Sequence, residues 1–181
     1  EAVGLLELNS IASGILATDV ALDTADVEIV LSRTICSGKY LVVFTGSVAA
    51  VQAAVESGKD QAVGAVIDSM VIANVHESIF PAIAGANPHV DDLDALGVVE
   101  SFSVGSLIEA ADAIAKSAAV ELLEIRLAMA LGGKAFVTFT GDVSSVTEAA
   151  EVGASVIAGK GLLVNKVVIP APHPQLYKDY L

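Results

Sequence analysis

The chain has 181 residues with a formal net charge of -13, and 54% of the residues are hydrophobic although only 4% are aromatic. This acidic balance argues against a nucleic-acid partner, because phosphate binding requires clustered Lys and Arg side chains. The longest uncharged run, Tyr40–Val55, is too short for a membrane-spanning helix, and no signal-peptide pattern opens the sequence. The mean hydropathy of +0.71 is high, so we expect interfaces between copies to bury part of the apolar surface.

The first half of the sequence predicts the order strand, helix, strand, strand, helix, strand. The strand "GLLEL" precedes a helix near residues 10–25, for which Ser10 is a suitable N-cap. Two strands follow, "VEIVLSR" and "KYLVVFTG", both rich in β-branched and aromatic residues. Ser47 can cap the next helix, near residues 48–57, which leads into the last strand.

The second half predicts the same order after a linker at residues 85–95, "GANPHVDDLDA", which carries a proline and three aspartates. Its helices are expected near residues 104–118 and 143–152, with Ser103 and Asp142 as their N-caps.

The two halves are copies of one sequence pattern. "GLLE" matches "GVVE", "ADVEIVLSR" matches "AAVELLEIR", "GKYLVVFTGSV" matches "GKAFVTFTGDV", and "VIANVHESIF" matches "VIPAPHPQLY". A repeat this long indicates a duplicated domain, with a first domain at 1–84 and a second at 96–181. Helices rich in Ala on one face of a short antiparallel sheet predict an α+β architecture for each domain.

The only cysteine, Cys36, lies in "RTICSGKY", in the short loop between two predicted strands. A single cysteine excludes an internal disulfide. Such a residue is most often a small buried hydrophobic side chain. A glycine-containing surface loop is a poor place for a core residue, however, so a role for the thiol is the competing interpretation.

Other groups carry weaker signals. The three histidines, His76, His89 and His173, share no metal-ligand spacing, and the "DDLD" run at Asp91–Asp94 lacks the spacing of a calcium loop. No nucleophile, base or paired-carboxylate pattern can be recognised, so we do not expect an enzyme.

Several segments together resemble the shell domain of bacterial microcompartments: "GVVE", "SLIEAADAIAKSAAVELLEIR", "GGKAFVTFTGDVSSVTEAAE" and "VIPAPHP". Both halves match, so the chain is similar to shell proteins with two tandem, ferredoxin-like domains of unpermuted strand order. The loop "RTICSGKY" is similar to that of the propanediol-utilisation T-type members. The resemblance implies a homotrimer that mimics a hexamer and serves as a structural element of a shell in the bacterial cytoplasm.

The resemblance also implies a central pore lined by the loops between the second and third strands. In the first half these residues are Thr34, Ile35, Cys36, Ser37, Gly38 and Lys39, and in the second half Ala128, Met129, Ala130, Leu131, Gly132 and Gly133.

In such a trimer three copies of Cys36 would meet on the threefold axis. The T-type resemblance implies a 4Fe-4S cluster held there by the three thiolates, with one iron open to another ligand. Electron transfer across the shell, or delivery of the cluster to redox enzymes inside it, would be the function. Backbone amides of Ser37, Gly38 and Lys39 could donate to the cluster sulfurs, and Lys39 would add positive charge if it pointed into the pore.

Contacts with other hexameric shell proteins are implied at the edges of the trimer. The family usually places a lysine after the first helix and an arginine in "IPRPH". This chain has Lys116 and Ala171 at these positions in the second half, and Asp23 at the lysine position in the first. A pore for small metabolites without a cluster is one alternative function, and a ligand-binding regulatory pair of α+β domains is another.

Overall fold

A computed structural model describes residues 1–86 and 92–180. The middle of the expected linker, residues 87–91, lies outside the described residues, and so do His89 and Asp91. The chain forms two compact units, Glu1–Val75 and His76–Leu181. In the described part of the chain, no helix has the length and apolar character that crossing a membrane requires.

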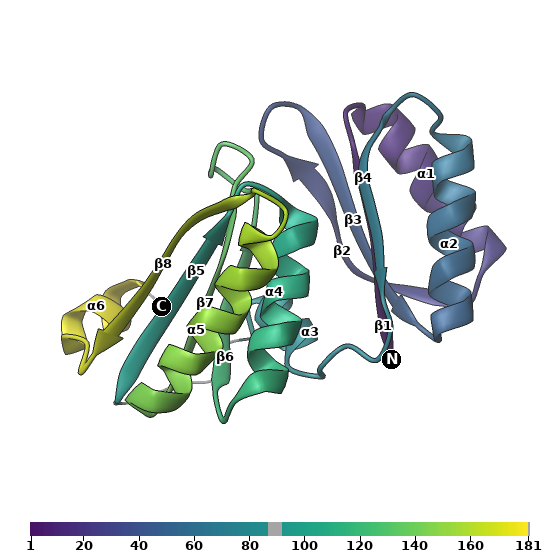
Figure 1. Cartoon of the computed structure of the whole chain (residues 1–181). Helices are drawn as coiled ribbons and strands as arrows, with labels where there is room; N and C mark the ends of the chain where they lie inside the picture. The colour runs from purple at the N-terminus through teal and green to yellow at the C-terminus, as the bar shows by residue number, and fades with distance from the viewer. Residues whose placement is uncertain (87–91, 181) are drawn as a thin grey trace. The chain divides into compact units, whose positions relative to one another are not determined.

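The first unit has the predicted order of elements (Figure 1). They are β1 (Ala2–Leu8), α1 (Ile11–Thr24), β2 (Val27–Ile35), β3 (Lys39–Gly46), α2 (Val48–Gln61) and β4 (Val66–Ile72). All strand pairs are antiparallel, and the sheet order is β2-β3-β1-β4. Both helices lie on the same face of this sheet (Figure 1).

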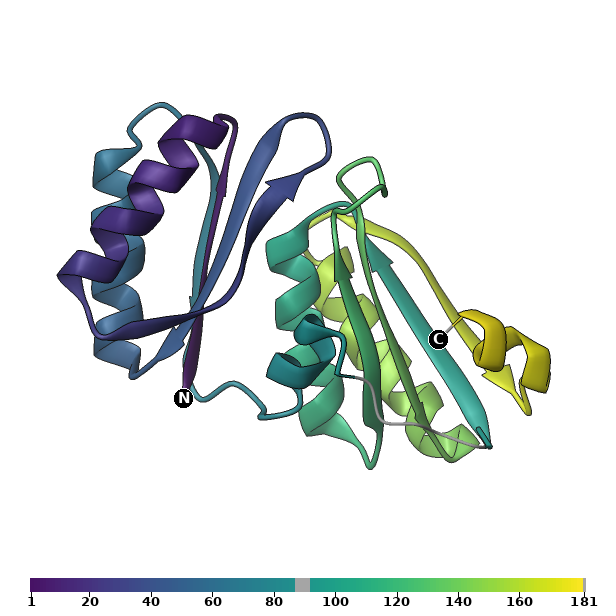
Figure 2. The ribbon, with the colours of Figure 1, turned by 180° about the vertical axis from the view of Figure 1, so that it is seen from behind.

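The second unit repeats this arrangement and adds a short helix at each end. Its elements are α3 (Ile79–Ala84), β5 (Ala95–Ser101), α4 (Val104–Ser117), β6 (Glu121–Leu127), β7 (Ala135–Gly141), α5 (Val143–Ala158), β8 (Leu163–Pro170) and α6 (Pro174–Tyr180). The sheet order is β6-β7-β5-β8. Seen from behind, α5 lies beyond the strands, so that the opposite face of the sheet is turned to the viewer (Figure 2).

The irregularities of the two sheets recur at equivalent places, which confirms the duplication. The register of β2 on β3 shifts between Ile29 and Leu31, and that of β6 on β7 between Leu122 and Glu124. A second shift occurs at the end of each central strand, β1 and β5. Because bulges reset which face each side chain occupies, the strands of both copies change face at equivalent positions.

The predicted N-caps form in the structure. Ser10 Oγ accepts from the N–H of Ser13 at 3.3 Å, and Ser103 Oγ accepts from that of Ser106 at 3.2 Å. At the start of α5, the Ser145 hydroxyl and then its N–H donate to Asp142 and hold the pKa of that carboxyl below its ordinary value. These side chains satisfy N–H groups that the helices themselves leave unpaired.

Helices α2 and α5 are longer than predicted, because a glycine in each continues the helix instead of ending it. We expected them to end near residues 57 and 152, but they run to Gln61 and Ala158. A Cβ on Gly153 would lie 2.5 Å from Ile114 Cδ1, and one on Gly58 would lie 2.6 Å from Leu6 Cδ1. Glycine costs about 1 kcal/mol of helix propensity relative to alanine, and the close packing it permits offsets that cost.

Replacing Gly153 by Val tests this packing role. The new side chain would collide with Ile114, which is fully buried on α4. We expect a loss of about 1–3 kcal/mol in the free energy of unfolding, measured by urea denaturation. Gly159→Val is the control, because its Cβ would meet only two backbone carbonyl oxygens, those of Ser155 at 3.4 Å and Val156 at 3.7 Å. Equal losses in the two variants would contradict the packing argument.

Candidate functional site

Cys36 lies in the tight hairpin that joins β2 to β3. Ile35 pairs with Lys39 at the end of the ladder, and residues 36–38 form the turn. Ser37 and Gly38 both have left-handed backbone conformations, with φ of 56° and 72°. Two consecutive left-handed residues suit the twist of a two-stranded hairpin. The cysteine is therefore held at the tip of the hairpin.

The exposure of this loop follows its place in the hairpin. Thr34, Ser37 and Gly38 are exposed and Cys36 is partly exposed, whereas Ile35 is 6% exposed and belongs to the core. Ile35 thus anchors the end of β2, while Cys36 beside it is partly exposed. The interpretation of Cys36 as a buried core residue does not hold for this chain.

An ion pair holds the foot of the hairpin. Lys39 Nζ lies 2.7 Å from Glu7 Oε1 on β1, and the two side chains are 26% and 7% exposed. Glu7 lies opposite Leu41, so this is a diagonal pair on one face of the sheet. Lys39 therefore points to Glu7, which compensates the positive charge that we considered for the pore.

The second copy keeps the ion pair but has a different loop. Lys134 Nζ lies 2.7 Å from Glu100 Oε1, and these side chains are 38% and 30% exposed. The loop at residues 128–134 is longer than its counterpart, and the Lys134 N–H donates to the Leu131 carbonyl at 3.2 Å. Left-handed conformations occur at Ala128, Ala130, Gly132 and Gly133.

The other side chains of this second loop, at residues 128–133, contain no charged or hydroxyl group. Met129 is 46% exposed, and Leu131 is partly buried. The loop contains no cysteine. Four left-handed residues give it a backbone unlike that of the Cys36 hairpin.

One further basic residue lies near the cysteine on β2. Arg33 is three residues before Cys36 and is only partly exposed. Its burial lowers the pKa of the guanidinium from the ordinary value. The Tyr40 hydroxyl on β3 and the Ser32 hydroxyl lie 2.5 Å apart across the hairpin. The hydrogen bond between these two hydroxyls joins β2 to β3 next to the turn.

The three residues expected at a shell edge have different surroundings. Asp23 is exposed on α1. Ala171 is exposed and has a left-handed φ of 47°, and its N–H donates to the Asp94 carbonyl at 2.8 Å. Lys116 Nζ lies 2.6 Å from Asp112 Oδ2, one turn earlier on α4.

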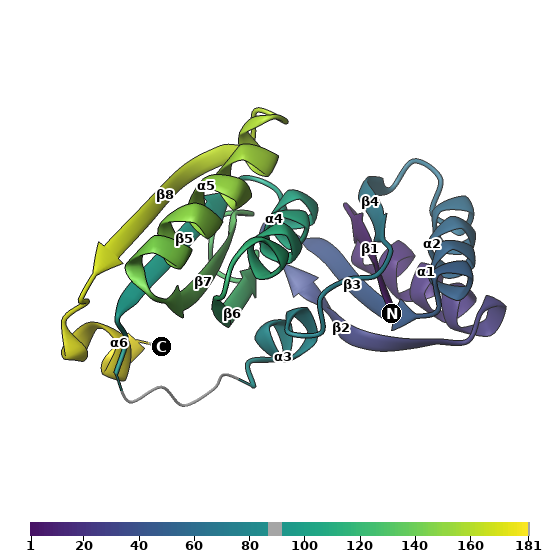
Figure 3. The same cartoon turned by 60° about the horizontal axis from the view of Figure 1, so that its bottom comes forward.

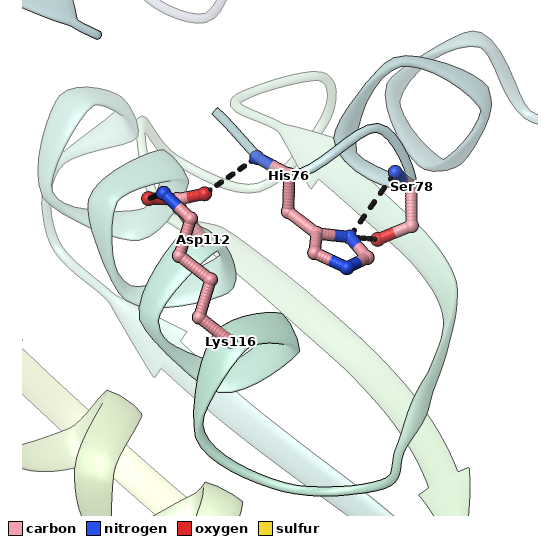
Figure 4. A network of polar contacts seen from close by, with 4 residues as sticks. All are labelled: His76, Ser78, Asp112 and Lys116. Carbon is pink, nitrogen blue, oxygen red and sulfur yellow. Dashed lines mark hydrogen bonds and ion pairs between the residues drawn. The ribbon is translucent and has the colours of Figure 1, made fainter. Parts of the chain in front are cut away.

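Asp112 on α4 has contacts that could not be predicted from the sequence (Figure 4). Its side chain is buried, with 8% of the residue exposed. Its other oxygen, Oδ1, accepts from the N–H of His76 at 2.7 Å. The His76 ring in turn lies beside Ser78, with Nδ1 at 2.8 Å from the hydroxyl. Only the Asp112 to Lys116 spacing was visible in the sequence, as an i, i+4 pair. The hydrogen bond from the His76 N–H, 36 positions away, has no pattern in the sequence that predicts it.

Within the residues that the structure describes, no group of three or more His, Cys, Asp or Glu side chains could hold a metal ion. Cys36 is thus the single thiol donor of one chain. One chain therefore supplies one thiolate at this hairpin.

Comparisons with known proteins agree with the geometry. A family model described as BMC domain matches residues 2–75 and 95–172. The chain is 43% identical to the bacterial microcompartment shell protein PduT of Citrobacter freundii, over 99% of this chain and 97% of that protein. It is 37% identical to the shell protein EutM of Salmonella typhimurium over 84 residues, which are 46% of this chain and 85% of EutM.

A solved structure is also similar over nearly the whole chain. The crystal structure of a microcompartments protein from Desulfitobacterium hafniense DCB matches with a TM-score of 0.94 and 46% sequence identity, covering 98% of each chain. The chain therefore belongs to the family of bacterial microcompartment shell proteins, with two BMC domains in tandem. The predicted family, the fold class and a place in a microcompartment shell are confirmed.

The ion pair at the hairpin can be tested against its counterpart in the second copy. Glu7→Gln removes the anion beside a mostly buried ammonium, and we expect a loss of about 2 kcal/mol in the free energy of unfolding. Glu100→Gln removes the same group from a more exposed pair and is expected to cost less than about 1 kcal/mol. Urea denaturation measures both variants, and a larger loss in Glu100→Gln would contradict this ranking.

Proposed function

We propose that this shell protein forms a homotrimer whose central pore binds one iron-sulfur cluster through three copies of Cys36. The observation that carries the proposal is the place of the only cysteine. It lies at a hairpin tip in one of two otherwise equivalent domains. A closed ring of three such chains has six domains around its axis and one thiol from every second domain.

Exposed apolar side chains on α1 support the association of copies. Ile11 and Ile15 are 39% and 56% exposed, whereas their equivalents on α4, Val104 and Ile108, are 1% and 0% exposed. Because the repeat places these pairs at the same positions of the same helix, α1 has an apolar face still to be covered. Burial of such side chains contributes about 1.5–3 kcal/mol each.

The second unit offers a surface that complements this helix. A hollow of about 380 Å³ lies on the sheet face opposite α5, and mostly apolar side chains line it. Thr138 in this hollow is 3% exposed, and its hydroxyl has no hydrogen-bond partner in the described part of the chain. The lining residues include Leu96, Val98, Phe136, Thr138 and Ile169. We infer that α1 of a second copy covers this face.

The donor chemistry of the hairpin fits an iron-sulfur cluster. Thiolates are the ligands that such clusters use, and three of them leave one iron for another ligand. Cys36 is partly exposed, and the turn holds Ser37 and Gly38 with their backbone at the surface. A 4Fe-4S cluster, when bound, would supply one-electron transfer across the shell or be delivered to redox enzymes inside it.

The residues around Cys36 would position the thiol and adjust its surroundings. Ile35 fixes the end of β2 in the core, and the Lys39–Glu7 pair fixes the start of β3. The hairpin therefore has little freedom to move the thiol away from an axis. The N–H groups of Ser37, Gly38 and Lys39 are candidate donors to cluster sulfurs, which would raise the reduction potential.

Other shell proteins are the proposed neighbours of the trimer. The relatives PduT and EutM are both microcompartment shell proteins. Asp23 on the exposed side of α1 replaces the lysine that such edges usually carry, and Ala171 replaces the arginine. Since an acidic edge repels its own copy and attracts a basic one, we expect hexamers with basic edges as neighbours.

The cluster can be tested by anaerobic reconstitution of the purified protein with ferrous iron and sulfide. We expect visible charge-transfer absorption and about four irons per three chains. Cys36→Ser should lose both, because it removes every thiolate. Ser37→Ala is the control and should keep both. A colourless wild type would instead support the plain metabolite pore, and a cluster unchanged in Cys36→Ser would show that Cys36 is not the ligand.

The trimer can be tested by placing a charge on α1. Ile15→Asp would bury a carboxylate in the proposed interface, at a cost of several kcal/mol, so we expect monomers in size-exclusion chromatography with light scattering. Val63→Asp is the control, because Val63 is 85% exposed and far from α1 in sequence. The wild type and this control should have the mass of three chains. A monomeric wild type, or a trimeric Ile15→Asp variant, would contradict the proposal.

A further inference from the structure

The segment that ends the first repeat packs on the second unit. After β4, the chain from His76 to Ala84 belongs to the second unit, and α3 packs against β6 and α4 (Figure 3). Each repeat therefore ends in a tail that follows its last strand: His76–Ala84 after the first and His173–Tyr180 after the second. We call these the first tail and the second tail.

The first tail has two anchors on the second unit. The N–H of His76 donates to Asp112 Oδ1 at 2.7 Å (Figure 4). Ile79, at the start of α3, is 0% exposed, and Leu122 on the adjoining strand β6 is 4% exposed. One anchor is thus a charge-assisted hydrogen bond and the other is apolar burial.

The second tail has the same local conformation, but the positions equivalent to His76 and Ile79 do not anchor it; its buried residue is Tyr177. In both tails the histidine Nδ1 accepts from the N–H two residues later, at 3.3 Å from Ser78 and at 3.2 Å from Gln175. However, nothing in the described part of the chain accepts from the His173 N–H. Leu176, the equivalent of Ile79, is 44% exposed.

The first unit carries the matching receptor surface, and it is uncovered. Asp19 on α1 is the equivalent of Asp112 and is exposed. Ile29 on β2 is the equivalent of Leu122 and is 41% exposed, compared with 4%. The second tail is held to its own unit by Tyr177, which is 6% exposed and packs with Leu96 and Leu123. Its Leu176 and the surface of Asp19 and Ile29 on the first unit are still uncovered.

We propose that the second tail of one copy docks on α1 and β2 of the next copy. Asp19 accepts from the His173 N–H, and Leu176 covers Ile29. This inference rests on the proposed trimer and specifies a contact within it. The tail and its receptor are different surfaces, so the contact is heterologous; such a contact gives a closed ring when three successive rotations complete a full turn, as the proposed trimer requires.

The charges around the receptor favour a donor from another copy. Asp112 has Lys116 Nζ at 2.6 Å from its second oxygen, whereas Asp23 takes the place of that lysine beside Asp19. Two carboxylates one helical turn apart repel each other. An N–H donor from the second tail would relieve this repulsion, as His76 supplies a donor to Asp112 in the second unit.

The test compares the Asp19→Ala variant with Asp26→Ala, which removes another exposed acid of the same unit. We expect Asp19→Ala to raise the concentration at which trimers dissociate at least about tenfold, measured by light scattering on dilution. Hydrogen exchange of peptides that cover the second tail should become faster in Asp19→Ala and not in Asp26→Ala. Leu176→Ala should weaken the trimer in the same direction.

The outcomes separate this inference from the proposed function. If the wild type is a trimer but Asp19→Ala leaves both dissociation and tail exchange unchanged, the docking contact is wrong and the trimer stands. If the wild type is a monomer, both are wrong. Asp112→Ala provides an internal comparison, because it should lower the free energy of unfolding of the chain without weakening the trimer.

Discussion

Each four-stranded sheet of this protein packs the two helices of its own repeat on the same face, and the rest of the structure depends on that constraint. An antiparallel sheet with apolar residues on both faces needs a second cover. In the second unit the face opposite α5 is an apolar hollow of about 380 Å³. The exposed isoleucines of α1 are apolar side chains that could fill such a hollow in another copy. The association between copies that we propose would cover these surfaces and so complete the layer architecture.

The order of the elements could be predicted from local signals alone. Ser10 and Ser103 mark helix starts because a cap depends only on neighbours in the sequence. Gly38 with flanking β-branched runs correctly predicted the hairpin at Cys36. The ends of α2 and α5 could not be predicted, because Gly153 is explained by Ile114, which is remote in sequence.

The site could be predicted only in part, for the same reason. The sequence placed Cys36 in a loop, but the Glu7 partner of Lys39 lies on another strand and has no sequence signal. The contact of Asp112 is the clearest feature that could not be predicted. Its hydrogen-bond donor is a backbone N–H, which almost any residue type can supply. Short helices such as α3 have too few residues for a periodic pattern to appear.

The fusion of two domains with different loops fixes the ratio of the two loops in any assembly of this chain. If the domain with Cys36 and the domain with residues 128–134 were separate chains, rings of six would assemble with a random mixture of the two loops. Few of those rings would carry three thiols in alternating positions. In the fused chain each thiol loop brings one thiol-free loop with it, so every closed ring of three chains has the same composition. In the proposed trimer the peptide connection between the domains would thus set this stoichiometry without any preference in affinity between unlike domains.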